Sequence, residues 1–136
     1  MVVSTRGRYA LRVMVDLTEH RDEGYIPLKE ISDRQEISLK YLESITSSLS
    51  KAGLVTGVSG KGGGYALAVD PSVCTAKSIL LATGEKLSSV ACLASDTNDC
   101  PRAAKCKTLP MWKKLNDVID DFFENITIED LMNGNL

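Results

Sequence analysis

Hydrophobic positions in the first 53 residues recur at the spacing of three helices. The first helix is expected to begin at Ser4 or Thr5, since either residue can serve as an N-cap. Its apolar positions share one face: Ala10, Val13, Met14 and Leu17. A second, short helix is expected to start at Pro27 and to end near Gln35, with Leu28 and Ile31 pointing inward.

A third helix is expected to follow Ser38, a good N-cap, and to stop at Gly53. Its apolar stripe is predicted to face the core: Leu39, Leu42, Ile45 and Leu49. The opposite face carries small hydroxyls, one aromatic ring and cations: Lys40, Tyr41, Ser44, Ser47, Ser48 and Lys51. Such a face can enter a DNA major groove, because small polar side chains reach base edges without bulk. An ordinary solvated helix face has the same composition, so this helix alone leaves both interpretations open.

Residues 54–69 predict two short strands around a glycine-rich tip. Apolar residues precede and follow the tip: Leu54, Val55, Val58, Tyr65, Leu67 and Val69. The tip itself, GKGGG, has four glycines and Lys61, and glycines there permit positive φ and close approach to a phosphate. It lacks the order of residues of a nucleotide-binding P-loop. Helices followed by such a hairpin predict a winged helix-turn-helix over residues 1–72.

The second half of the chain, residues 73–136, predicts a short helix, an unpatterned loop and a long helix. The short helix is stopped by Gly84, and residues 88–107 show no periodicity. A loop of roughly 20 residues is unusual in a compact domain unless it is functional or tied down. Residues 109–132 predict one long amphipathic helix with this apolar stripe: Trp112, Leu115, Val118, Ile119, Phe122 and Ile126. The stripe can cap its own core, but a helix carried outside a winged module suits a two-fold dimer. The predicted fold class is mainly α with a small β-hairpin.

Three cysteines, Cys92, Cys100 and Cys106, share the unpatterned loop with the spacing C-x7-C-x5-C. Iron–sulfur clusters take thiolate ligands from loops of this kind. Zinc sites prefer paired C-x2–4-C spacing, which is absent here. Zinc, a metal-free thiol sensor, and cysteines that are inert or disulfide-bonded are the other interpretations.

Charge and composition limit the classes of function that the chain can have. The net charge of −2 argues against a nucleic-acid binder, and residues 1–70 balance nine basic against nine acidic side chains, so DNA binding requires a local basic patch. No apolar run approaches the roughly 18 residues of a membrane span, and no signal peptide opens the chain, so we expect a cytoplasmic protein. An enzyme is not expected, because the single histidine, His20, has no evident nucleophile beside it.

Four segments, STRGRYAL, ISLKYLE, LSKAGLVTGVSGKGGGYAL and CKTLPMW, are similar to the IscR-like family of bacterial winged-helix regulators, which includes NsrR-type and CymR-type members. The resemblance spans residues 4 to about 132. It implies a homodimeric transcription regulator of repressor type that binds double-stranded DNA at a near-palindromic operator. It also implies long helices that cross between subunits, and DNA binding controlled by an iron–sulfur cluster, 2Fe–2S in preference to 4Fe–4S.

The chain departs from this family at the fourth cluster ligand. IscR-like members typically carry a histidine three residues after the last cysteine, where this chain has Leu109. Other members use an acid or a histidine of the partner's first helix, and the comparable positions hold residues that do not suit: Arg8, Tyr9 and Arg12. Asp96 and Asp99 can supply oxygen, Cys74 is a remote candidate, and a small thiol or water is the other choice. The fourth ligand therefore stays unassigned, and the signal can be iron–sulfur status or nitric oxide.

We expect groove contacts from four residues of the third helix: Ser38, Lys40, Tyr41 and Ser44. Lys61 at the wing tip is expected to enter the minor groove or to touch a phosphate. Ser4, Thr5 and Arg6 are expected to hold a backbone phosphate at the N-terminus of the first helix. The alternatives are a nitric-oxide sensor or metal-free thiol switch of the same fold and, from another class, an iron–sulfur carrier or redox protein.

Overall fold

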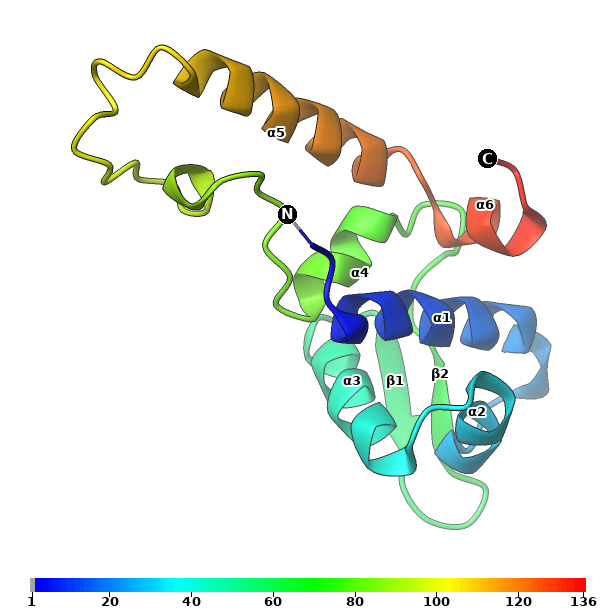
Figure 1. Ribbon diagram of the computed structural model, residues 1–136. Coiled ribbons are helices and arrows are strands. Elements are labelled where there is room, and N and C mark those ends of the chain that lie inside the picture. Colours follow the sequence, from blue (N-terminus) through cyan, green and yellow to red (C-terminus); the bar gives the residue numbers. More distant parts are fainter. Residues whose placement is uncertain (1) are drawn as a thin grey trace.

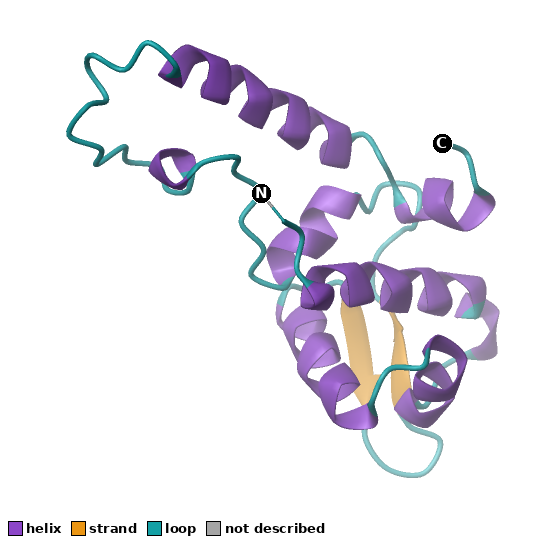
Figure 2. Ribbon diagram, in the orientation of Figure 1, coloured by secondary structure: helices purple, strands orange, loops and turns teal. Residues whose placement is uncertain are grey.

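The computed structural model describes residues 2–136 and is mainly helical, with one small β-hairpin (Figures 1 and 2). In chain order the elements are α1 (Thr5–Glu19), the 3-10 turn η1 (Arg21–Glu23), α2 (Leu28–Gln35), α3 (Leu39–Lys51), β1 (Val55–Val58), β2 (Gly64–Leu67), α4 (Ala76–Ala82), the 3-10 turn η2 (Ala91–Leu93), α5 (Leu109–Glu124) and α6 (Ile128–Asn133). Helices α1 to α4, the hairpin and α6 gather into one body, which we call the head (Figure 1). Residues 88–107, which we call the cysteine loop, and α5 extend away from it (Figure 1).

The predicted starts of the first three helices, and the predicted ends of the second and third, are confirmed. The Ser4 hydroxyl caps α1 by accepting a hydrogen bond from the Gly7 N–H at 3.0 Å. The Ser38 hydroxyl caps α3 in the same way, from the Tyr41 N–H at 3.2 Å. Gly53 follows α3 with a φ of +76°, a left-handed conformation that favours glycine and ends the helix.

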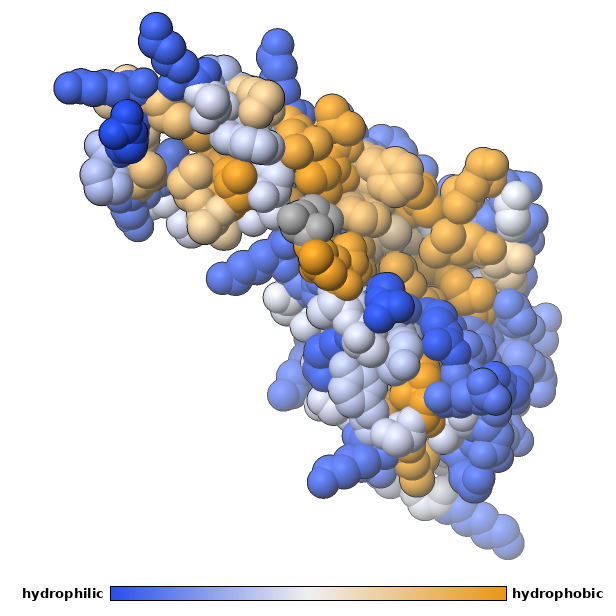
Figure 3. Space-filling view, in the orientation of Figure 1, coloured by the Kyte–Doolittle hydropathy of each residue, from blue (hydrophilic) through white to orange (hydrophobic). Residues whose placement is uncertain are grey.

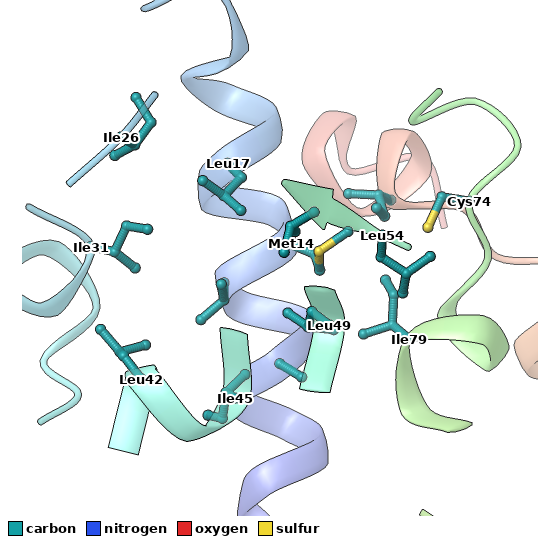
Figure 4. Close-up of a cluster of buried hydrophobic side chains, with 14 of the residues drawn as sticks. Met14, Leu17, Ile26, Ile31, Leu42, Ile45, Leu49, Leu54, Cys74 and Ile79 are labelled. Atoms are coloured by element: carbon teal, nitrogen blue, oxygen red, sulfur yellow. The ribbon is translucent and has the colours of Figure 1, made fainter. Parts of the chain in front are cut away.

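One face of α1 forms the centre of the core, and all four apolar positions predicted for it are buried. Figure 4 shows two of them, Met14 and Leu17, among side chains from α2, α3 and α4. The prediction for Leu39 is wrong, because this side chain is 42% exposed. Leu39 is the first residue of α3, and the buried stripe begins one turn later, at Leu42.

The core continues past residue 72. Cys74, Ile79 and Ile128 are buried in the same cluster as the apolar side chains of α1 and α3. The division into residues 1–72 and 73–136 stays a prediction, and the hydrophobic packing joins its two sides.

The hairpin is antiparallel, with Val55 opposite Leu67 and Val58 opposite Gly64. Its β2 strand is also tied to the segment before α2. The Ile26 N–H donates to the Tyr65 carbonyl at 2.8 Å, and the Tyr65 N–H donates to the Ile26 carbonyl at 2.9 Å. The wing is therefore fixed to the helix-turn-helix by backbone as well as by side chains.

The predicted single helix over residues 109–132 is wrong. Helix α5 ends at Glu124, and α6 begins at Ile128 after a capping box in which Thr127 and Asp130 exchange hydrogen bonds. Backbone bonds then pair this segment with the start of α4: Ala76 N–H to the Ile126 carbonyl at 2.7 Å and Ile128 N–H to the Cys74 carbonyl at 2.9 Å. The break returns the chain to the head, so α6 packs on α1.

A buried ion pair fastens α2 to α1. Asp16 of α1 is 2% exposed and accepts two hydrogen bonds from Arg34, at 2.8 and 3.0 Å, and one from Gln35 at 2.9 Å. Burial alone would raise the pKa of Asp16, but the hydrogen bonds from both partners and the Arg34 charge outweigh it and hold that pKa below its ordinary value.

No helix within residues 2–136 has both the length and the apolar character needed to cross a lipid bilayer.

We predict that Asp16→Asn lowers the free energy of unfolding by about 1–3 kcal/mol at pH 7, because it removes charge-assisted bonds from a buried site. A carboxyl whose pKa is lowered on folding stabilises the folded state above its ordinary pKa, which is near 4. This stabilisation is lost as the pH falls through the lowered pKa. The difference from the wild-type protein should therefore be full at pH 7 and shrink as the pH falls below about 4. Urea unfolding across this pH range measures it.

Asp33→Asn is the matched control. Asp33 pairs with Lys29 at 2.8 Å on the surface of α2, with a side chain that is 63% exposed. Its loss should change the free energy of unfolding by less than about 0.5 kcal/mol. Equal losses for the two variants would contradict the role assigned to Asp16.

Candidate DNA-binding surface and cysteine loop

The outer face of α3 has the small polar side chains and cations that the sequence predicts. Lys40, Ser44 and Lys51 are exposed, and Glu43 is the only acid of this helix. Tyr41 is half-buried, because its ring packs edge-on against Tyr9 of α1 with the ring centroids 5.7 Å apart. Lys40 and Lys51 are thus open to a groove, while Tyr41 presents only part of its ring.

Arg6 reaches from α1 onto this face of α3. Its guanidinium donates to the Ser44 hydroxyl at 2.7 Å, to the Ser44 carbonyl at 3.1 Å and to the Ser48 hydroxyl at 2.5 Å. From the sequence, a phosphate contact is predicted for Arg6 and a groove contact for Ser44, as separate features. The structure brings them together, so a fixed positive charge lies on the surface of α3 that carries its hydroxyls.

The N-terminus of α1 is engaged by an acidic side chain from a distant part of the chain. The Ser4 N–H donates to one carboxylate oxygen of Glu85 at 2.6 Å, and the Ser4 hydroxyl donates to the other at 2.7 Å. The Thr5 hydroxyl accepts from Arg8 at 3.1 Å. A carboxylate at this end of a helix is favoured by the helix dipole. Sequence reasoning missed Glu85, because no local pattern relates it to a residue 81 positions earlier.

The wing tip presents Lys61 to solvent between Gly60 and Gly62, whose φ angles are +86° and +78°. In Figure 1 this tip extends beyond the ends of α2 and α3. Gly64, at the base of the wing, has a φ of +149°, and a Cβ added there would lie 2.3 Å from the Ile26 carbonyl oxygen. Glycine at this position is what allows β2 to bond to Ile26.

The three cysteines of the loop are free thiols: Cys100 is exposed, and Cys92 and Cys106 are half-buried. A surface hollow of about 360 Å³ is lined by Cys92, Cys100 and Asp99 together with small neighbours. Cys106 lies outside this lining, next to the start of α5. There the hydroxyl of Thr108, 3.3 Å from the sulfur, and the Thr108 backbone N–H lower the pKa of Cys106 below its ordinary value.

The donor set suits an iron–sulfur cluster in its chemistry, since three accessible thiols share one loop. These thiols are not gathered around one point in the structure. Within residues 2–136 no group of three or more histidine, cysteine or acidic side chains is close enough to hold a metal ion. Of the acidic candidates, Asp99 shares a hollow with two cysteines, whereas Asp96 lines a different one. Cys74 is 4% exposed in the core, where burial raises the pKa of its thiol, which fits a packing role.

Side-chain hydrogen bonds tie the start of the cysteine loop to α5. Near its start, the Ser89 N–H and hydroxyl both donate to the Asn116 side-chain oxygen of α5, at 2.8 and 2.7 Å. The segment between Glu85 and Ser89 therefore joins the N-terminus of α1 to α5.

Helix α5 has no fully buried residue in the single chain. Lys77 of α4 anchors it by an ion pair with Asp120 at 2.7 Å. Four apolar side chains on one face remain 40–64% exposed: Met111, Leu115, Val118 and Phe122. Figure 3 shows hydrophobic surface along this helix. The predicted stripe is thus divided, because Trp112 and Ile119 are half-buried while Leu115, Val118 and Phe122 remain open to solvent.

A winged helix-turn-helix head with a polar recognition helix, followed by a cysteine-bearing loop and an open apolar helix, defines a DNA-binding transcription regulator. The sequence profile of the Rrf2 family, described as iron-dependent transcriptional regulators, matches residues 3–134. The chain therefore belongs to the Rrf2 family, and its relatives are regulators and not enzymes.

Individual relatives support this family membership. The HTH-type transcriptional regulator IscR of Vibrio vulnificus is 39% identical over 135 residues, which cover 99% of this chain and 79% of the relative. Among solved structures, CymR of B. subtilis, described as its global cysteine regulator, aligns with a TM-score of 0.78 and 32% identity over 98% of this chain and 97% of its own. IscR of T. potens aligns with a TM-score of 0.76 and 32% identity over 100% of this chain and 89% of its own.

We predict that Gly64→Ala lowers the free energy of unfolding by about 3 kcal/mol and weakens operator binding, because the new Cβ would collide with the Ile26 carbonyl and detach the wing. Gly62→Ala is the control. Its φ is also positive, but a Cβ there meets nothing within 4 Å, so only backbone strain of about 1 kcal/mol is expected. Urea unfolding and fluorescence anisotropy with operator DNA measure both. Equal effects would show that the contact with Ile26 does not matter.

Proposed function

We propose that this chain is a homodimeric transcription regulator of repressor type, acting in the cytoplasm, whose DNA binding is controlled by an iron–sulfur cluster held by Cys92, Cys100 and Cys106. The observation that carries the proposal is the position of three free thiols on one loop that leads from the head to the open helix α5. Membership of a family described as iron-dependent supports it. The IscR relatives support an iron–sulfur cofactor, and we favour a 2Fe–2S form over 4Fe–4S.

The loop's own geometry supports control by ordering. The cysteines are spread along it, and its hydrogen bonds to α5 are made near its start, by Ser89. Drawing the three thiolates together would restrain residues 88–107 and bias the head and α5 toward one arrangement. A bound cluster would supply redox-active iron held by these thiolates. Its reduction potential would depend on its ligands and on its exposure to solvent. Asp99 is our candidate for the fourth donor, because it shares a hollow with Cys92 and Cys100.

The DNA contacts are proposed from the head. Lys40, Tyr41 and Ser44 of α3 would face the major groove, with Ser38 at the helix start, and Lys61 would reach the minor groove or a phosphate. Ser4, Thr5 and Arg6 lie beside this surface, since Arg6 bonds to Ser44. In the structure Arg6 already covers that hydroxyl, so Ser44 would read bases together with the guanidinium.

A second copy of the chain is the proposed partner of α5. Helices of this length are marginal alone in water, and α5 buries no residue completely within its own chain. Its open apolar positions 111, 115, 118 and 122 follow one another at steps of four, three and four, as in helices that pack along their length. A two-fold pairing would set two copies of α3 against a near-palindromic operator.

A metal-free thiol switch is the second candidate. It is favoured by the exposure of Cys100 and by the structural similarity to CymR, a cysteine regulator that aligns over 98% of this chain. A nitric-oxide signal acting on the cluster is a variant of the first proposal. A cluster carrier from outside this family is disfavoured, because it would leave the winged head without a use.

We predict that anaerobically prepared protein shows iron–sulfur absorption and Mössbauer spectra, and that Cys92→Ala, Cys100→Ala and Cys106→Ala each lose them. Cys74→Ala, which changes a buried thiol outside the loop, should keep them. Operator affinity should differ between the cluster-loaded and the cluster-free protein and should fall steeply with salt in both. Intact spectra in all three loop variants would refute the ligand assignment. Colourless wild-type protein would instead favour the thiol switch.

We predict that changing Val118 and Phe122 together to Glu produces a monomer, because each buried apolar side chain contributes about 2 kcal/mol to such an interface. Sedimentation velocity measures the change, and operator affinity should fall with it. Lys114→Glu, an exposed polar position of the same helix, should remain dimeric. A dimer that survives the double substitution would place the interface elsewhere.

A further inference from the structure

The segment 85–89 is held at both ends by pairs of short hydrogen bonds, one pair to the head and one to α5. We propose that Glu85 is a positioning residue that couples the cysteine loop to the DNA-reading surface of α3. This inference rests on the proposed function and names the route by which the loop would act on DNA binding.

The first step of this route is the contact between Glu85 and Ser4. Both carboxylate oxygens are used, one by the Ser4 N–H at 2.6 Å and one by its hydroxyl at 2.7 Å. Within residues 2–136 Glu85 forms no ion pair with a lysine or an arginine. Its carboxylate is therefore used to hold the start of α1 and not to neutralise a cation.

Close packing reinforces this contact. Gly7 is buried in the first turn of α1, and a Cβ added there would lie 3.1 Å from a methyl carbon of Leu80 and 3.3 Å from a carboxylate oxygen of Glu85. The end of α4 and Glu85 can approach α1 this closely because residue 7 has no side chain. A shift of Glu85 would thus be felt by the first turn of α1 through contact as well as through hydrogen bonds.

The second step runs from the first turn of α1 to the recognition helix. Arg6, two residues after Ser4, donates to Ser44 and Ser48 of α3 at 2.5–3.1 Å. These hydroxyls lie on the polar face of α3 that we propose to meet DNA. A change at Ser4 therefore repositions a guanidinium on the reading surface itself.

The third step links Glu85 to the loop. Four residues later, Ser89 is fixed to Asn116 of α5 by its N–H and hydroxyl, and Cys92 follows three residues beyond. Direct bonds thus run from α5 through residues 85–89 to Ser4, and from Arg6 to α3. Restraint of the thiolates would be transmitted along this path, and by linkage DNA on α3 would restrain the loop in return.

The test compares Glu85→Gln and Glu85→Ala with the control Glu19→Gln, an exposed acid at the far end of α1. For the wild-type protein and the control we expect the ratio of operator affinities between cluster-loaded and cluster-free protein to be about 5- to 150-fold. The Glu85 variants should bring this ratio close to one. A second readout uses cluster-free protein alone: amide hydrogen exchange of residues 4–8 should be faster in both Glu85 variants.

Each outcome supports or overturns the coupling through Glu85. Glu85 variants that keep both the wild-type ratio and the wild-type exchange would overturn the coupling while leaving the proposed function intact. A ratio of one in the wild-type protein would overturn the proposed function and the coupling together. Faster exchange with an unchanged ratio would show that Glu85 only holds α1, and would overturn its role in the response.

Discussion

The burial of one face of α1 is the constraint on which the rest of the structure depends. This helix packs against α2, α3, β2, α4 and α6, so nearly every element of the head is positioned by the same 15 residues. The apolar positions of this face, Ala10, Val13, Met14 and Leu17, are at most 1% exposed, and Asp16 on the same helix adds a buried carboxylate that accepts hydrogen bonds from Arg34 and Gln35 of α2. Because close-packed interiors transmit displacement, movement of α1 would carry the recognition helix and the attachment of the loop with it.

Most of the head could be predicted from the sequence, because its signals are local. A capping hydroxyl such as Ser4 or Ser38 bonds to a backbone N–H three residues ahead, and a helical stripe repeats every three or four positions. Leu39 shows where this fails. Leu39 has the spacing of the apolar stripe. As the first residue of the helix, however, its side chain lies beyond the neighbouring element that buries the rest of the stripe.

The C-terminal part was harder to predict for a different reason. Apolar residues continue at helical spacing from Trp112 to Ile126, and periodicity cannot reveal a break of three residues within such a run. The break did leave a signal, since Thr127 and Asp130 have the spacing of a capping box. The contacts of Glu85 with Ser4 and of Arg6 with Ser44 left none, because a single sequence does not relate residues 81 and 38 positions apart.

The negative net charge misrepresents the surface that would meet DNA. Many of the acids of the second half lie on α5, which Figure 1 places on the opposite side of α1 from the wing tip, and one of them, Asp120, is paired with Lys77. Charges separated by more than about 8–10 Å are largely screened at physiological ionic strength. What the DNA backbone would experience is therefore the local set on α3, where Lys40 and Lys51 are joined by Arg6 from α1 and opposed only by Glu43. The positive charge of this surface depends on a contact between helices, which makes it sensitive to how α1 is held.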